Sequence, residues 1–159
     1  MPFQKVVNPY QAPAVAGDFA SANPNASMLA GEGALVAGDS GVTVGVFAWA
    51  DADGKVSNNK ATGGRIGFVH REQQASITGF LDEQGNTILK GQVMTLMTGG
   101  DFWARFPAGA VIGQNVFAKD TDGTLKSSAA ATEAGHTLTK FKVASTAGAG
   151  ELAKITSWE

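Results

Sequence analysis

The sequence predicts an all-β protein: a small β-barrel or jelly-roll-like sandwich that carries an extended N-terminal arm. Two observations lead to this prediction. Short apolar runs rich in β-branched and aromatic residues alternate with Gly and Asp turn signals at intervals of about 8–12 residues, as in β-sandwiches and barrels. Glycine accounts for 21 of the 159 residues, about twice its ordinary share. We therefore expect an arm over residues 1–30 and a single β domain over residues 31–159.

The arm has an unusual composition for a chain terminus. Residues 1–30 contain only two charged side chains, Lys5 and Asp18, and their apolar residues follow neither the helical nor the strand period. Four prolines prevent a helix from running through it, whereas a disordered tail is richer in charge and poorer in aromatic residues. We therefore expect an extended arm that becomes ordered against another subunit or a larger surface. The residues expected to make these contacts are Phe3, Val6, Val7, Pro9, Tyr10, Pro13, Val15, Phe19 and Pro24.

Beyond the arm, the apolar runs predict a series of short strands. The first, over residues 42–49, is β-branched and aromatic, and a turn at residues 51–54 leads to a return strand at residues 55–57. Residues 127–134 contain helix-forming residues but no apolar stripe, so we expect a loop there with at most one helical turn. The remaining expected strands cover residues 65–70, 75–81, 93–98, 101–106, 114–118, 138–145 and 152–158.

Two segments of the domain are similar to each other. Residues 46–57 and 116–127 match if one residue is omitted, and each contains an Asp-x-Asp-Gly turn. The likeness fits a duplicated half-barrel, and it equally fits independent use of Asp-Gly, a common tight hairpin turn. Both segments also resemble calcium loops, but the first ligand position would be Trp49 or Ala118, and neither side chain binds metal. We therefore predict two hairpin turns and no metal site.

The run over residues 42–50 is apolar on both faces of the expected strand. A strand with one exposed face would alternate between apolar and polar residues. We therefore expect one face to pack in the core and the other to meet a neighbouring subunit or the arm.

Alternation also assigns faces in the strand over residues 101–106. Phe102, Ala104 and Phe106 are expected on one face, with Trp103 and Arg105 on the other. Because Trp and Arg are enriched among interface hot spots, Trp103 and Arg105 are candidate interface residues. The alternative is that the Trp covers a sheet edge with the Arg stacked on it.

The composition argues against several classes of function. Charged residues make up 16% of the chain and the net charge is −2, with no basic patch, so neither nucleic acid nor a membrane is an expected partner. The chain has no cysteine, which removes thiolate metal sites and Cys nucleophiles. His70 and His136 lack the companions of a catalytic site. We therefore expect no enzyme and no cofactor. The N-terminus lacks signal-peptide features, so we expect synthesis in the cytoplasm.

One further feature of the arm is the run NPYQAPAVAGDFASANP at residues 8–24, followed by LAGEGALVAG at residues 29–38. These segments resemble the structural cement, or capsid decoration, proteins of tailed bacteriophages, most strongly over about residues 7–50. The resemblance implies a virion protein, made in the bacterial host cytoplasm, that binds the outer surface of the icosahedral shell. It implies as partners the major capsid protein, whose neighbouring subunits it would hold together, and further copies of itself in a homodimer or homotrimer. It implies no catalytic residues.

A second function remains open at this point. A carbohydrate- or receptor-binding β-sandwich on the virion surface would use exposed aromatic residues, such as Trp49 or Trp103, as a sugar platform, and Tyr10 in the arm would have no role. Binding to purified phage shells, compared with binding to bacterial surface glycans, distinguishes the two functions.

Overall fold

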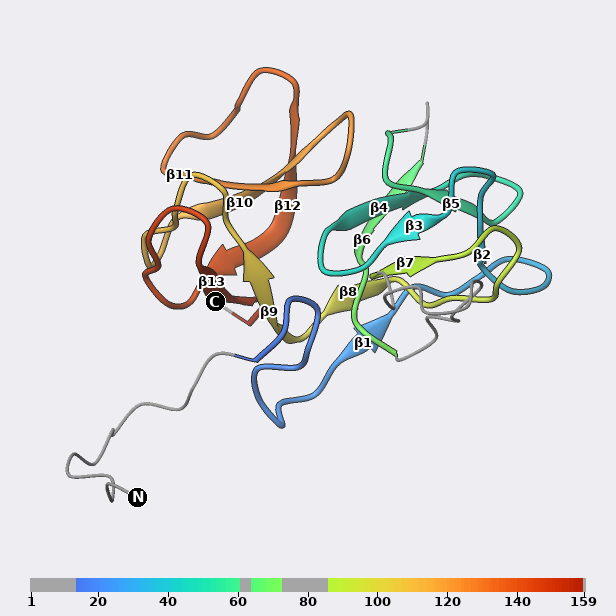
Figure 1. The fold of residues 1–159 in the computed structure, drawn as a ribbon, viewed down its shortest axis with the longest axis horizontal. Helices are drawn as coiled ribbons and strands as arrows, with labels where there is room; N and C mark the ends of the chain where they lie inside the picture. Colours follow the sequence, from blue (N-terminus) through green and yellow to red (C-terminus); the bar gives the residue numbers. More distant parts are fainter. Residues whose placement is uncertain (1–13, 61–63, 73–85, 159) are drawn as a thin grey trace, which may run out of the picture.

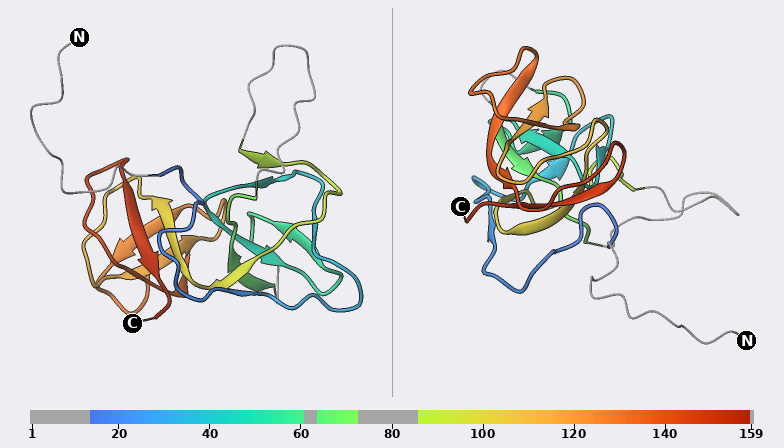
Figure 2. Two further views of the ribbon diagram at one scale, coloured as in Figure 1. Left: turned by 90° about the horizontal axis from the view of Figure 1, so that it is seen from below. Right: turned by 90° about the vertical axis from the view of Figure 1, so that its left-hand side faces the viewer.

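A computed structural model describes residues 14–60, 64–72 and 86–158 of the chain. In these ranges it contains thirteen β-strands, and none of the described residues forms a helix that could cross a membrane. The strands form a six-stranded, a five-stranded and a two-stranded sheet. The two large sheets lie side by side, with the five-stranded sheet on the left and the six-stranded sheet on the right of Figure 1 and of the left view in Figure 2. The expected all-β fold of sandwich or barrel type is therefore confirmed.

The six-stranded sheet is curled. Its strands are, in spatial order, β1 (Ala26–Ser27), β8 (Met97–Gly99), β6 (Arg65–Phe68), β4 (Phe47–Ala50), β5 (Lys55–Ser57) and β2 (Val36–Ala37). The outer edge of β2 bonds to the chain just before β8, because the N–H of Met94 donates to the carbonyl of Leu35 at 2.9 Å. The chain from Met94 to Gly99 therefore bonds beside β2 at one edge of the sheet and then forms β8 near the opposite edge. This connection curls the sheet towards a barrel. The small sheet pairs β3 (Val42–Thr43) with β7 (Thr87–Ile88).

The five-stranded sheet is antiparallel throughout. Its spatial order is β11 (Leu125–Ser128), β10 (Asn115–Lys119), β12 (His136–Val143), β13 (Leu152–Thr156) and β9 (Asp101–Arg105). A single residue, Gly100, separates β9 from β8 of the other sheet. Its φ of 130° lies in the region that favours glycine. The chain therefore passes from one large sheet to the other at Gly100.

Most expected strands are present with altered bounds. The strand expected over residues 42–49 is interrupted, because Gly45 has a φ of 81° and lies so close to the arm that an added Cβ would be 2.9 Å from Ala16. Residues 93–96 were expected to be part of a strand, but β8 begins only at Met97. The strand expected over residues 75–81 lies outside the described residues. Strands β1, β2 and β7 were not expected. Strand β11 is the return strand of the second expected hairpin, and it includes the first two residues of the loop expected over residues 127–134.

Strand β4 separates two hydrophobic cores. Phe47 and Trp49 belong to the core between the two large sheets, whereas Ala48 and Ala50 point into the core enclosed by the curled six-stranded sheet. All four residues are buried. The expectation that one face packs in the core and the other meets a neighbour or the arm is therefore met through the arm, because Met28 and Ala30 of the arm pack against the core that contains Ala48 and Ala50.

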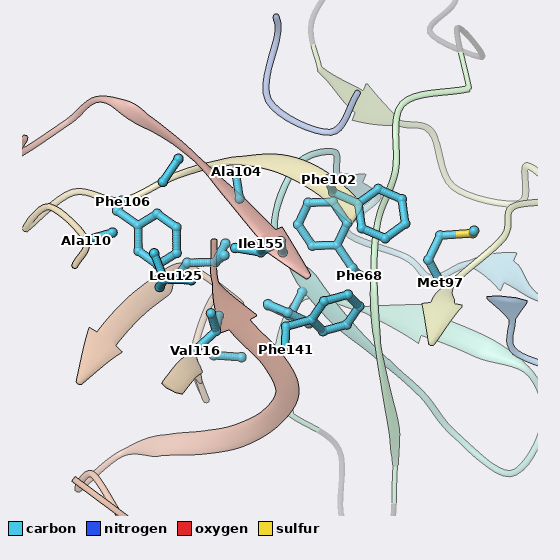
Figure 3. Packing of buried hydrophobic residues seen from close by; sticks show 14 of the residues in the cluster. Phe68, Met97, Phe102, Ala104, Phe106, Ala110, Val116, Leu125, Phe141 and Ile155 are labelled. Atoms are coloured by element: carbon cyan, nitrogen blue, oxygen red, sulfur yellow. The ribbon is translucent and has the colours of Figure 1, made fainter. Parts of the chain in front are cut away.

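An aromatic cluster joins the two large sheets. Phe68 of β6 lies 5.0 Å, between ring centroids, from Phe102 of β9, and Phe47 of β4 lies 5.7 Å from Phe141 of β12. Figure 3 shows the rings of Phe68, Phe102 and Phe141 converging from three different strands. Such pairs contribute about 0.5–1.5 kcal/mol beyond the area that they bury. The cluster therefore fixes the relative position of the sheets.

Both Asp-x-Asp-Gly segments form hairpin turns, as expected. The first joins β4 to β5, and the Asp51 carboxylate accepts hydrogen bonds from the backbone N–H groups of Asp53 and Lys55 at 2.9 and 2.8 Å. The second joins β10 to β11, and the Asp122 carboxylate accepts from the N–H of Thr124 at 3.0 Å. Both carboxylates therefore act as local acceptors that shape a turn.

Candidate interaction surface

The described part of the arm is extended and lies along β9. The N–H of Gly17 donates to the carbonyl of Trp103 at 2.7 Å, and the N–H of Trp103 donates to the carbonyl of Asp18 at 2.9 Å. Ala20 adds a bond to the carbonyl of Asp101 at 2.9 Å. Further along, β1 pairs with β8. In Figure 1 this blue segment follows the junction of the two sheets. Residues 17–27 are thus bonded to both sheets, and we call them the strap.

The strap is held on its other side by the residues that follow β6. The N–H of Arg71 donates to the carbonyl of Gly17 at 2.9 Å, and the Arg71 guanidinium lies 3.6 Å from the carboxylate of Asp18. The Phe19 ring packs against the His70 ring at a centroid distance of 5.0 Å. The strand expected over residues 65–70 ends earlier, at Phe68, so His70 lies two residues beyond β6, and its ring packs against the strap.

Asp101 fastens the middle of the strap. Its Oδ2 accepts hydrogen bonds from Ser21 Oγ and Asn23 Nδ2, both at 2.6 Å. Burial raises the pKa of Asp101, but hydrogen bonds from Ser21, Thr156 and Asn23 together outweigh it, so the pKa lies below its ordinary value. Sequence reasoning missed this role because partners about eighty residues apart leave no local pattern.

The arm residues proposed as contacts fall into two groups. Val15, which precedes the strap, is 44% exposed. Phe19 and Pro24 belong to the strap and are also exposed, Phe19 to 43%, although the strap is bonded to the domain. These three are available to a partner. The others lie outside the described residues: Phe3, Val6, Val7, Pro9, Tyr10 and Pro13.

The faces predicted for β9 are confirmed. Phe102, Ala104 and Phe106 are completely buried in the core between the sheets. Trp103 lies on the opposite face, but only 8% of it is exposed, because the strap borders it and Lys154 of β13 pairs with it across the sheet.

The charged partner of Trp103 differs from the one considered in the sequence. The ammonium of Lys154 lies 5.1 Å from the Trp103 ring centroid, a cation–π contact. Arg105 is exposed, and its guanidinium donates to the carbonyl of Gly150 at 2.7 Å. Arg105 is thus the more accessible of the two β9 candidates.

Large exposed apolar side chains add residues that the sequence did not single out. Trp158, which follows β13, is 56% exposed, and Ile112 and Leu29 are 61% and 87% exposed. Single residues of this kind carry little information, because they are common on protein surfaces. Trp158 differs in that it lies beside the polar residues around Asp101.

Comparisons with known proteins place these features in context. Residues 3–157 match the family described as XM1 gp53 minor capsid protein. The fold is similar to that of a chain in the solved structure of the capsid of Myoviridae phage XM1, with a TM-score of 0.61 and 18% sequence identity over 99% of this chain and 98% of that chain. At this identity, the likeness shows a shared fold. No curated protein matches the sequence.

Proposed function

The chain belongs to the XM1 gp53 minor capsid protein family, and from this premise we propose that it is a decoration, or cement, protein of a tailed phage. Membership of the family makes it a structural protein of the virion. The finer proposal is that it binds the outer surface of the icosahedral shell and stabilises contacts between neighbouring major capsid subunits. The observation that best supports it is the arm, which is poor in charge and leaves Val15 and Phe19 exposed where it borders the domain.

The strap gives this arm a firm base. It is bonded to β9, β8 and the residues after β6, so a force on residues 1–13 would be transmitted to both large sheets. An attachment needs such a base, because a partner bound to a loosely tethered segment would not be fixed relative to the domain. The proposed contacts are the arm residues, together with the exposed Arg105 and the edge of Trp103.

We further propose that the protein acts as a homodimer or homotrimer. Several arms on one oligomer would bind the shell simultaneously, and linked weak contacts reach an avidity well above that of each one. Only 16% of the residues are charged, compared with about 25% in ordinary soluble domains. An oligomer would account for this difference, because part of the surface would be buried between its subunits.

The alternative of a sugar platform at Trp49 or Trp103 loses its basis. Trp49 is 1% exposed and Trp103 is 8% exposed, so neither indole presents a face to a ligand. Stacking requires an accessible ring face.

The proposal is tested with mature shells of the parent phage that lack this protein. Purified protein should co-sediment with the shells, saturate, and raise the temperature at which they melt. Electron microscopy of the decorated shells should place the added density outside the shell. Failure to pellet with the shells at saturating concentration, together with unchanged shell melting, would refute the proposal.

A further inference from the structure

A pocket of about 290 Å³ lies between the strap, β9 and β13. Its walls include Ser21 and Asn23 of the strap, Asp101, Thr156 and Trp158. Trp158 is 56% exposed, and its backbone N–H donates to Thr156 Oγ1 at 3.2 Å. Of the three tryptophans in the chain, this is the one whose indole is open to solvent.

The polar wall of this pocket is pre-arranged. Asp101 Oδ2 accepts from Ser21 Oγ and Asn23 Nδ2 at 2.6 Å each, which fixes both side chains. The Asn23 amide carries another N–H and an acceptor oxygen beyond this bond, whereas the Ser21 hydroxyl donates its one proton to Asp101, accepts the backbone N–H of Asn23 at 3.0 Å and keeps one lone pair for a ligand. Because these groups are fixed before binding, a ligand would lose less affinity to ordering them.

Charge in the pocket is balanced. Asp101 is ionised at neutral pH, since its pKa lies below the ordinary value of 3.8. Lys154 also lines the pocket, and its ammonium lies 5.1 Å from the centroid of the Trp103 ring. One carboxylate and one ammonium favour a neutral ligand that donates and accepts several hydrogen bonds.

We infer that this pocket binds a single neutral pyranose ring. A pyranose has an apolar C–H face, which would stack on the Trp158 indole, and a rim of hydroxyls, which would bond to the amide, hydroxyl and charged groups opposite. Ligand sites combine an apolar surface with a few placed polar groups in this way. The volume is near the lower end of the usual range of about 300–1,000 Å³ for ligand pockets, which suits one ring rather than an oligosaccharide.

This site borders the proposed shell attachment, because Ser21 and Asn23 lie between Phe19 and Pro24 of the arm. Trp158 is not among the residues assigned to the capsid, and the ligand class is different. A virion protein with such a pocket could bind a free sugar or one residue of a surface polysaccharide, because both present the same ring.

The pocket is tested by titrating the full chain with glucose, galactose, mannose and N-acetylglucosamine, using saturation-transfer NMR and tryptophan fluorescence. At least one sugar should bind saturably, with a Kd of about 1 mM, equivalent to about −4 kcal/mol. Trp158→Ala should weaken that binding at least tenfold, and Asn23→Ala should also weaken it. Leu138→Ala, which truncates another side chain that is 48% exposed but lies outside this pocket, should bind as the unmodified protein does.

Two results would overturn the inference: no saturable binding of any of the four sugars, or equal binding by Trp158→Ala and the unmodified protein. If one of the sugars binds, a polysaccharide built from that sugar separates the sources, since tighter binding of the polymer identifies a polysaccharide and equal binding identifies the single ring. Shell co-sedimentation of Trp158→Ala is measured in parallel. It should be unchanged, so that failure of the sugar site is distinguished from failure of shell attachment.

Discussion

The backbone N–H of Phe47 donates a hydrogen bond of 3.0 Å to the carbonyl oxygen of Gly123. Phe47 begins β4 in the first hairpin, and Gly123 lies in the turn of the second. The two similar hairpins, one in each large sheet, are therefore in direct contact. The backbone of Phe47 leaves no room for a side chain at Gly123, because an added Cβ would collide with the Phe47 carbonyl.

Gly123→Ala should therefore destabilise the fold strongly. Its φ of 73° is unfavourable for alanine, which costs about 1–2 kcal/mol, and the collision with Phe47 should bring the loss in unfolding free energy to at least about 3 kcal/mol. Gly113→Ala is the matched control, because Gly113 has a φ of 84° but no atom within 4 Å of an added Cβ. Urea unfolding of both variants measures the difference; equal losses would show that the contact with Phe47 is unimportant.

Arg105, the last residue of β9, and the adjacent Phe106 should affect different properties when replaced. Phe106 is completely buried, so Phe106→Ala should lower the unfolding free energy by about 3–5 kcal/mol. Arg105→Ala should change stability by less than about 1 kcal/mol and weaken shell binding by about 2 kcal/mol, if Arg105 is an interface hot spot. Unfolding and co-sedimentation decide; full shell binding by Arg105→Ala would remove this residue from the proposed interface.

Truncation should separate attachment from folding. Deleting residues 1–13 should leave unfolding unchanged and weaken shell binding. Deleting residues 1–25 should also lower the unfolding free energy by about 1–3 kcal/mol, because it removes the bonds from Gly17 and Ala20 to β9, each contributing about 0.5–1.5 kcal/mol. Circular dichroism during thermal unfolding measures this. Equal stability of the two truncated proteins would show that the strap is not part of the fold.

Acid should loosen the strap through Asp101. Because its pKa is lowered below 3.8 in the folded state, ionised Asp101 stabilises the fold at neutral pH, and this stabilisation is lost as the pH falls from about 4 through the folded-state pKa. Hydrogen exchange of the Gly17 and Ala20 amides, relative to that of core amides, should therefore accelerate over this range. In Asp101→Asn, which has no carboxyl group to titrate, the relative acceleration should be smaller. An identical response in both proteins would assign the effect to other groups.

Calcium should have no effect on stability. The carboxylates of Asp51 and Asp122 already accept backbone N–H groups in their turns, and the described residues contain no group of three potential metal ligands. The melting temperature should agree within about 1 °C in excess EDTA and in millimolar calcium, because a ligand that does not bind cannot shift the unfolding equilibrium. A rise of several degrees with calcium would reveal a site.

The sequence alone determined the local features of this protein. β-branched and aromatic runs between turn signals predicted the strands, since strand propensity and turn chemistry act over a few neighbouring residues. Alternation placed Phe102, Ala104 and Phe106 in the core, and the Asp-Gly segments became hairpins. The arm sequence also identified the capsid family resemblance.

Only the tertiary structure decided which surfaces meet. The sequence showed that β4 is apolar on both faces, but two cores of the same chain fill them, because the six-stranded sheet curls on one side and the five-stranded sheet packs on the other. It likewise did not show that Asp101 holds Ser21 and Asn23, or that Lys154 covers Trp103. These contacts join residues that are distant in sequence, and they exist only once the chain has folded.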